Sequence, residues 1–301
     1  MQESHPIFIG GDGRSGTTLL SVILDSHPVL RVGPELHFRG PPNLGPYILR
    51  CLGIREGCSS TEEWVAHKKD KELYTGVHFV NRCHRFGIEP RELRGFVEQA
   101  MHACSSDLES FEDRCALIEI LGECTRRRSD ASRWGIKIMR EIRVLDWYAK
   151  VWPKAQFVHI IRDGRDVASS QMTEHASWGY EDIEQAAVKW VELIRRVRRS
   201  TNAERIYELR YEDLVCEPLP TLRQLVDFLK VSWNEEMLRH QSQELPLFRN
   251  PYDHPSIDTV VRPINSSAVG RYRRDLSSKQ IEAFEEIAGD SLRELGYKSP
   301  S

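Results

Sequence analysis

Long apolar runs are absent from this 301-residue chain, and no stretch approaches the roughly 20 residues that a membrane-spanning helix needs. The N-terminus lacks the basic patch and apolar core of a signal peptide. The seven cysteines include no C-x-x-C pair, and the eleven histidines include no H-E-x-x-H. A net charge of −3 lacks the basic surplus of nucleic-acid-binding domains. We therefore expect a cytoplasmic protein with reduced thiols and without a metal site, a membrane span or a nucleic-acid partner.

The chain does contain short strand-like runs that alternate with helical stretches. The runs that predict strands are residues 7–9, 30–32, 134–138, 156–161 and 205–211. Helices are expected at residues 17–26, 141–151, from 165 onward, 181–200 and 219–229. This alternation predicts an α/β fold, with a central parallel sheet and helices on both faces.

No repeat, low-complexity tract or linker divides the chain, so we expect a single domain over residues 1–301. Residues 43–128 are polar and favour helix, with glycine and serine interruptions. We interpret them as a helical insertion between core strands that shapes the pocket for an acceptor substrate.

A glycine-rich loop, Gly11-Asp12-Gly13-Arg14-Ser15-Gly16-Thr17-Thr18, follows the first strand and opens the first helix. Unpaired N–H groups and the dipole favour an anion at such a helix start. The glycine spacing fits the G-x-G-x-x-G of a dinucleotide site and also a P-loop, although Thr17 stands where the P-loop has lysine. Arg14, together with the hydroxyls of Thr17 and Thr18, favours a terminal phosphate that is held without a metal.

A second strand-to-helix turn contains Arg162 at the end of its strand and Ser170 two turns into its helix. These two side chains predict a second phosphate site. The alternative is local structure, in which Arg162 and Arg165 pair with Asp163 and Asp166.

Together the two motifs resemble the nucleotide-binding elements of the sulfotransferase family, which uses 3′-phosphoadenosine 5′-phosphosulfate (PAPS). Residues 13–18 resemble the loop that binds the 5′-phosphosulfate. Arg162 and Ser170, eight residues apart, match the pair that grips the ribose 3′-phosphate. Tyr211, in Tyr211-Glu212-Asp213-Leu214, is similar to a tyrosine that contacts the adenine end. The resemblance covers about residues 6–40 and 133–215.

Within that family the chain is most similar to the tyrosylprotein sulfotransferase branch, through Phe8-Ile9-Gly10-Gly11, Leu24-Asp25-Ser26-His27-Pro28 and Arg262-Pro263-Ile264-Asn265. The likeness implies that Arg271 reaches a cofactor phosphate and that Lys137 lies near the transferred sulfuryl group.

The same likeness implies Glu35 as the catalytic base and Arg14 as the group that stabilises the leaving phosphate. Two departures from the branch lie beside that base. Pro34 replaces an acidic residue, and His37 replaces an arginine, which makes His37 a rival base.

The resemblance therefore implies transfer of a sulfuryl group from PAPS to an acceptor hydroxyl, which leaves adenosine 3′,5′-bisphosphate. We expect a small-molecule acceptor rather than a protein tyrosine, because the chain lacks the membrane anchor and the paired cysteines of a secretory-pathway enzyme. Two other functions remain open at this point: a nicotinamide-dependent oxidoreductase and a non-catalytic nucleotide-binding module. The oligomeric state is left open, a homodimer included.

Overall fold

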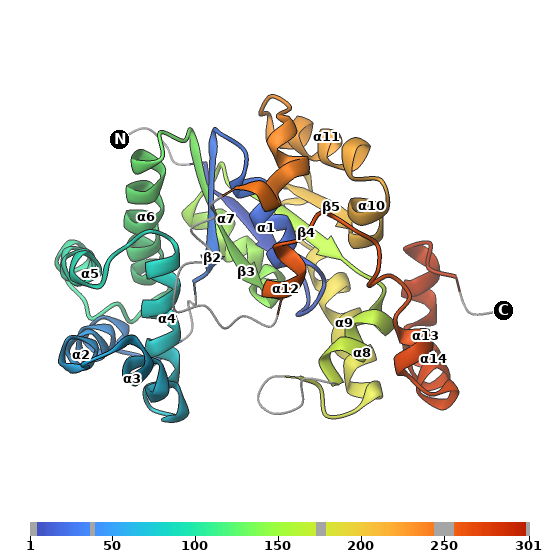
Figure 1. Cartoon of the computed structure of the whole chain (residues 1–301), viewed down its shortest axis with the longest axis horizontal. Helices are drawn as coiled ribbons and strands as arrows, with labels where there is room; N and C mark the ends of the chain where they lie inside the picture. Colours follow the sequence, from blue (N-terminus) through green and yellow to red (C-terminus); the bar gives the residue numbers. More distant parts are fainter. Residues whose placement is uncertain (1–4, 37–39, 173–178, 244–255, 299–301) are drawn as a thin grey trace. The chain divides into compact units, whose positions relative to one another are not determined.

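The computed structural model describes residues 5–36, 40–172, 179–243 and 256–298. Within them, five strands form one parallel sheet in the order β2-β3-β1-β4-β5 (Figure 1). The strands are β1 (Ile7–Gly10), β2 (Leu30–Glu35), β3 (Arg133–Met139), β4 (Gln156–Ile161) and β5 (Ile206–Arg210). Helices flank this sheet, and the predicted α/β fold is confirmed.

The apolar runs of the sequence form the most deeply buried strands. Every residue of β1 is buried, and so are five of the six residues of β4. A parallel sheet covered on both faces requires such unbroken apolar strands, because neither face meets water. The sequence of β1, Ile-Phe-Ile-Gly, therefore specifies a strand inside the sheet.

The residues divide into two compact units, each assembled from three stretches of the chain. The first unit comprises Met1–Ile7, Ser21–Lys137 and Arg239–Arg262. The second unit comprises Phe8–Leu20, Ile138–Leu238 and Pro263–Ser301. The single domain over residues 1–301 stays a prediction.

Helices make up most of the first unit. They are α2 (Leu44–Gly57), α3 (Thr61–Ala66), α4 (Tyr74–Arg85), α5 (Pro90–Cys104), α6 (Phe111–Arg128) and α12 (Ile257–Val260). Serine side chains begin two of them, because Ser60 and Ser110 accept hydrogen bonds from the backbone of Glu63 and Asp113 at 3.1 and 3.0 Å. Residues 43–128 thus contain the helices α2 to α6, of which α3 and α6 begin with a serine cap.

The second unit surrounds β4 and β5, whose residues pair in step from Phe157 opposite Ile206 to Ile161 opposite Arg210. Its helices are α7 (Leu145–Val151), α8 (Gly164–Met172), α9 (Ile183–Arg198), α10 (Tyr211–Cys216), α11 (Pro218–Leu229), α13 (Tyr272–Asp275) and α14 (Ser278–Glu294). Helices α9 and α14 pack together through a shared apolar core. In the described part of the chain, no helix has both the length and the apolar character for crossing a membrane.

Candidate active site

The glycine-rich loop joins β1 to α1 (Thr17–Asp25), and two of its residues adopt left-handed backbone conformations. Gly16 has a φ of 98° and Arg14 has a φ of 69°. A Cβ atom on Gly16 would lie 2.5 Å from Cδ2 of Tyr211, so a side chain at this position has no room. The loop therefore turns tightly into α1, whose first N–H groups have no partner within the helix and are suited to an anion.

The two predicted anion motifs contact each other within the second unit. Nε of Arg14 donates a hydrogen bond to Oγ of Ser170, in α8, at 3.0 Å. Arg162, which follows β4, donates from Nη1 to the backbone oxygen of Arg14 at 3.1 Å. The structure thus brings Arg162 and Ser170 to Arg14 beside the start of α1, although Ser170 lies 156 residues after Arg14 in the chain.

Arg162 occupies the centre of this cluster and is nearly inaccessible to solvent. Its guanidinium carbon lies 4.6 Å from the ring centroid of Tyr211, and Nη2 donates to the backbone oxygen of Ala268. The same guanidinium lies 3.4 Å from the carboxylate of Asp166. Its Nε is buried without a hydrogen-bond partner among the described residues, so one donor of Arg162 remains for a ligand.

The local pairing that the sequence left open is also present. Arg165 pairs with Asp163 at 2.7 Å and with Glu285 of α14, and it donates to the backbone oxygen of Lys298. Because Arg165 is buried and its donors are used, its role is structural. Arg162 differs, since it combines the Asp166 pair with the contact to Arg14.

Arg271 lies at the start of α13, where a chain of hydrogen bonds fixes it. Its Nε donates to Asp275 at 2.7 Å, and Asp275 also accepts from Oγ of Ser169 at 3.0 Å. The buried carboxylate of Asp166 accepts from the backbone N–H groups of Gly270 and Tyr272, on both sides of Arg271. The segment that contains Arg271 is thereby tied to the helix that contains Ser170.

In the first unit, Glu35 at the end of β2 lies opposite Lys137, which is two residues before the end of β3. Nη2 of Arg82, from α4, lies 3.7 Å from Oε2 of Glu35. Nη1 of Arg82 is buried and has no hydrogen-bond partner within the described part of the chain. These residues place one carboxylate among cations at the carboxyl edge of the sheet, where α/β enzymes bind their ligands.

Lys137 is almost completely buried, with 3% of its surface exposed. This burial lowers the pKa of its ammonium group from 10.5 to about 8. The negative charge of Glu35 opposes the shift, whereas the positive charges of Arg82 and Arg85 add to it. A lysine of this kind still carries its charge at neutral pH and loses it in mildly alkaline solution.

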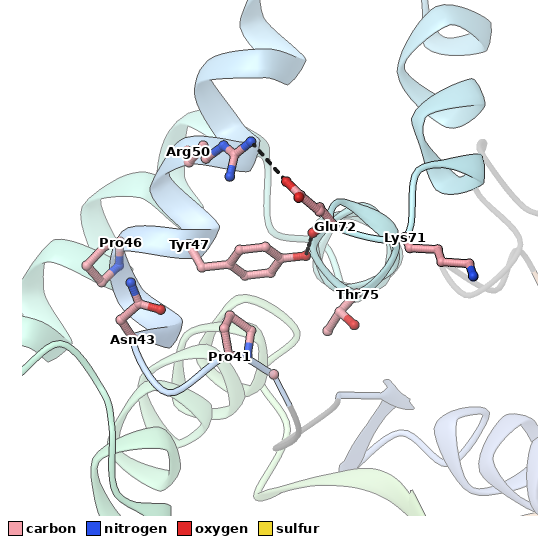
Figure 2. A pocket seen from close by; sticks show the side chains of 9 residues that line it. Pro41, Asn43, Pro46, Tyr47, Arg50, Lys71, Glu72 and Thr75 are labelled. Atoms are coloured by element: carbon pink, nitrogen blue, oxygen red, sulfur yellow. Dashed lines mark hydrogen bonds and ion pairs between the residues drawn. The ribbon is translucent and has the colours of Figure 1, made fainter.

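A hollow of about 580 Å³ lies in the same unit, between the start of α2 and the start of α4 (Figure 2). The residues that line it are Gly40, Pro41, Asn43, Pro46, Tyr47, Arg50, Lys71, Glu72 and Thr75. Figure 2 shows the ring of Tyr47 reaching across to the N-terminal end of α4. Its hydroxyl donates to the backbone oxygen of Glu72 and accepts from the N–H of Gly76, both at 2.8 Å.

The family model described as the sulfotransferase family matches residues 6–235 of the chain. The chain belongs to the sulfotransferase family. This match and the enzymes similar to the chain decide against a nicotinamide-dependent oxidoreductase and against a non-catalytic nucleotide-binding module.

The sulfotransferase is similar to curated relatives that act on protein tyrosine according to their names. Protein-tyrosine sulfotransferase A of Caenorhabditis elegans is 24% identical over 298 residues, which cover 97% of this chain and 67% of that protein. The protein-tyrosine sulfotransferase of Drosophila melanogaster is 25% identical over 308 residues, which cover 98% of this chain and 52% of that protein. The chain therefore spans between about half and two thirds of the length of these relatives.

Solved structures share the fold. The sulfotransferase domain of the olefin synthase from Synechococcus PCC 7002 is 21% identical with a TM-score of 0.65, and the alignment covers 100% of this chain and 98% of that chain. The sulfotransferase domain from the curacin biosynthetic pathway is 18% identical with a TM-score of 0.64, over 100% of both chains. Mouse SULT7A1 complexed with PAP is 13% identical with a TM-score of 0.51, over 96% of this chain and 85% of that chain.

The structure places the residues predicted for this sulfotransferase in two groups. Arg14, Arg162, Ser170 and Tyr211 contact one another in the second unit, directly or through shared partners. Glu35 and Lys137 are neighbours in the first unit, and their roles stay predictions. His37 lies outside the described residues, so its rivalry with Glu35 also stays a prediction.

The sequence interpretation missed several residues at these two places. Arg82 was missed because it lies in the helical insertion, 47 residues after the carboxylate that it contacts. Asp12 lies inside the predicted loop, yet its partners Arg140 and Tyr180 are distant in sequence. The one signal in the sequence is an acidic residue inside a predicted phosphate-binding loop, because such a residue needs a positively charged partner. Among the residues that the structure describes, no cluster of three or more histidine, cysteine or acidic side chains is arranged to hold a metal ion.

Proposed function

We propose that this sulfotransferase transfers a sulfuryl group from PAPS to the hydroxyl group of a small molecule and releases adenosine 3′,5′-bisphosphate. The observation that carries the proposal is the hydrogen bond from Arg14 to Ser170, since it unites two anion-binding motifs. PAPS carries phosphate groups at both the 5′ and 3′ positions of one ribose. A donor of this kind requires two anion sites close together, and the cluster beside α1 supplies both.

Each part of the donor has residues of suitable chemistry. We assign the 5′-phosphosulfate to Arg14, to the hydroxyls of Thr17 and Thr18 and to the first N–H groups of α1. We assign the ribose 3′-phosphate to Arg162 and Ser170. The buried Nε of Arg162 that has no partner among the described residues supports this second assignment.

Two further residues complete the donor site. Tyr211 packs beneath the guanidinium of Arg162 and against Gly16, which supports a place near the adenine end. Arg271 is tied through Asp275 and Ser169 to the helix of Ser170, which supports a role toward the 3′-phosphate.

In the transfer step, the acceptor oxygen bonds to sulfur as the bond from sulfur to the 5′-phosphate oxygen breaks. Glu35 takes the proton of the acceptor hydroxyl, and a positioned base of this kind accelerates a reaction by about 10²–10⁴-fold. The leaving phosphate gains negative charge, which Arg14 and the N–H groups of α1 stabilise. The ammonium group of Lys137, beside Glu35, stabilises charge on the sulfuryl group.

We place the acceptor in the first unit, between Glu35 and the hollow around Tyr47. Thr75 lines the hollow and Arg82 contacts Glu35, and the two lie seven positions apart in α4. Two helical turns span about 10 Å, which is the length of a small organic molecule. The hollow, at about 580 Å³, lies within the range of roughly 300–1,000 Å³ that is usual for small-molecule sites.

Incubation with labelled PAPS and a panel of phenols, alcohols, sugars and tyrosine peptides tests this function. We expect a phenol, alcohol or sugar to be labelled, with loss of labelling in Glu35→Gln. Faster labelling of tyrosine peptides would contradict the small-molecule acceptor. If no acceptor is labelled while adenosine 3′,5′-bisphosphate binds tightly, the catalytic assignment is wrong and the donor site stands.

We also propose a cytoplasmic location, which the state of the cysteines supports. All seven lie within the described residues and are free. Burial raises the pKa of the Cys83 and Cys115 thiols far above the usual value, which makes them unreactive. Trapping thiols in intact cells before lysis should find every cysteine reduced, and a disulfide would contradict this location.

A further inference from the structure

The loop to which we assign the 5′-phosphosulfate contains a buried acidic residue, although an anion-binding loop favours positive charge. Asp12 lies between Gly11 and Gly13 and is 2% exposed. A carboxylate at this position repels a phosphosulfate, and the low dielectric of a buried site strengthens such repulsion. The loop therefore needs a compensating charge in order to bind its donor.

Among the residues that the structure describes, four donors reach the carboxylate of Asp12, and one of these four is charged. The N–H of Gly13 and Nε2 of Gln171 donate to Oδ1 at 2.7 and 3.2 Å. The hydroxyl of Tyr180 donates to Oδ2 at 2.8 Å. Nε of Arg140 donates to Oδ1 at 2.5 Å and carries the positive charge. Three of these groups thus converge on Oδ1 and one reaches Oδ2.

Arg140 is held in place by its neighbours in the second unit. Its Nη2 donates to Oε1 of Gln171 at 2.9 Å, and its guanidinium carbon lies 4.7 Å from the ring centroid of Tyr180. The residue before it, Met139, has a φ of 48°, in the left-handed region that β-strand residues avoid. The oxygen of Met139 accepts from the N–H of Gly11 at 3.2 Å, which ties this strained turn to the loop.

Gln171 connects the pair to the loop backbone. Its Nε2 donates both to Asp12 and to the backbone oxygen of Gly13, the latter at 2.9 Å. Asp12 also occupies the N–H of Gly13, so this N–H is not turned toward the nucleotide. The network thus determines both the shape of the loop and the N–H groups that remain for a phosphate.

We propose that Arg140 is a positioning residue whose charge cancels that of Asp12 and so makes the loop fit to bind an anionic donor. The proposal rests on the proposed function for the identity of that donor. It goes beyond a scaffolding role, because a neutral side chain could satisfy the same hydrogen bonds. It therefore predicts that the affinity lost when Arg140 loses its charge is restored when Asp12 loses its charge as well.

Titration calorimetry with adenosine 3′,5′-bisphosphate distinguishes the two roles. Arg140→Gln leaves the buried carboxylate uncompensated and should raise Kd by about ten- to a hundred-fold. Asp12→Asn keeps an oxygen for Gly13 and presents its amide to the Tyr180 hydroxyl, which can also accept. It should bind as tightly as the wild type or tighter, and the double variant should return to within about threefold of the wild type.

Matched controls separate charge from shape. Arg143→Gln removes a neighbouring exposed arginine that pairs with Glu141 outside the network, and it should leave Kd unchanged. Arg140→Lys keeps the charge without the planar fork and should stay within about fivefold of the wild type.

Three results would overturn the proposal. If the double variant bound adenosine 3′,5′-bisphosphate as weakly as Arg140→Gln does, Arg140 would have only a structural role. The same conclusion would follow if Arg140→Lys bound the nucleotide as weakly as Arg140→Gln does. If Arg140→Gln does not fold, Asp12→Asn alone decides, because a loss of more than tenfold there contradicts electrostatic repulsion.

A second titration, with inorganic pyrophosphate, keeps this proposal separate from the proposed function. The wild type, Arg140→Gln, Asp12→Asn and the double variant should follow the same order of affinity with pyrophosphate as with adenosine 3′,5′-bisphosphate. A wild type that binds pyrophosphate and not adenosine 3′,5′-bisphosphate would contradict the donor assignment, and the order of the variants on pyrophosphate would still decide the role of Arg140.

Discussion

At the scale of single residues, Arg14 serves both the binding of the donor and the departure of its phosphate. Its backbone is held in the left-handed region, and its Nε bonds to Ser170. Arg14→Ala should therefore raise the Kd of the nucleotide and also lower kcat, because the developing charge on the leaving group loses a stabilising cation. Calorimetry and turnover of PAPS measure the two effects.

Arg14→Lys is the matched variant, since it keeps the charge and loses the planar donor that contacts Ser170. It should retain more turnover than Arg14→Ala. Turnover within threefold of the wild type in Arg14→Ala would show that the loop has been assigned wrongly.

Glu35 carries the clearest chemical prediction. Glu35→Gln preserves the shape of the side chain and cannot take a proton, so kcat should fall by about 10²–10⁴-fold while nucleotide affinity stays unchanged. The acidic limb of the kcat/KM profile should disappear in Glu35→Gln and persist in His37→Ala. A nitrophenol acceptor, which ionises readily, should partly restore the activity of Glu35→Gln. An inactive His37→Ala with an active Glu35→Gln would assign the base to His37 instead.

Lys137 predicts a loss of activity in alkaline solution. Burial lowers the pKa of its ammonium group from 10.5 to about 8, so the side chain is charged at pH 7 and becomes neutral as the pH rises through 8. A step that needs this charge should slow above about pH 8, which a pH profile of kcat measures. A profile that stays flat to pH 10 would remove Lys137 from the transfer step.

The same shift has a consequence for stability. Between about pH 8 and 10.5 the unfolded chain binds more protons at Lys137 than the folded chain. The contribution of Lys137 to the free energy of unfolding therefore rises with pH across this window. Lys137 is destabilising in its charged form, which is the expected cost of a functional buried charge.

At the scale of elements, glycine allows α6 to approach β3 closely in the first unit. A Cβ atom on Gly122 of α6 would lie 2.3 Å from Cδ2 of Trp134, a buried side chain of β3. Gly122→Ala should therefore lower the free energy of unfolding by about 1–3 kcal/mol, through overpacking. Denaturant unfolding measures this change.

Gly95, in α5, provides the matched control, because a Cβ atom there would meet nothing within 4 Å. Gly95→Ala should raise the free energy of unfolding by about 0.5–1 kcal/mol, since alanine favours the helix. If Gly122→Ala also raised the free energy of unfolding, helix propensity rather than the contact with Trp134 would dominate at Gly122.

The sequence predicted the five strands better than it predicted the helices. The five strands were predictable because each is a compact strand-like run that ends near a turn or a loop. The expected helix over residues 141–151 begins instead with a 3-10 helix, Arg140–Val144, whose first residue donates a hydrogen bond to Asp12. Helix α14 was not predicted, although Ser277 and Gln280 form a readable capping box at its start.

At the scale of the whole molecule, what could not be predicted depends on contacts between distant parts of the chain. Nothing local sets the strand order, in which β3 comes between β2 and β1. The motif spacing indicated two anion sites, and only the fold showed that Arg14 and Ser170 contact each other. The side chains that contact Glu35 and Asp12 include ones from 47 to 168 residues away, beyond any periodic pattern.

The donor site as a whole makes one comparison of ligands decisive. Calorimetry on the wild type should show adenosine 3′,5′-bisphosphate binding about 10- to 100-fold more tightly than adenosine 5′-monophosphate, because Arg162 and Ser170 form charge-assisted hydrogen bonds to the 3′-phosphate. Ser170→Ala should shrink this ratio, and it should weaken binding of the monophosphate less than binding of the bisphosphate, because Ser170 also holds Arg14 through a hydrogen bond. Equal affinities for the two nucleotides in the wild type would contradict the account, since the cluster of Arg14, Arg162 and Ser170 would then hold no second phosphate.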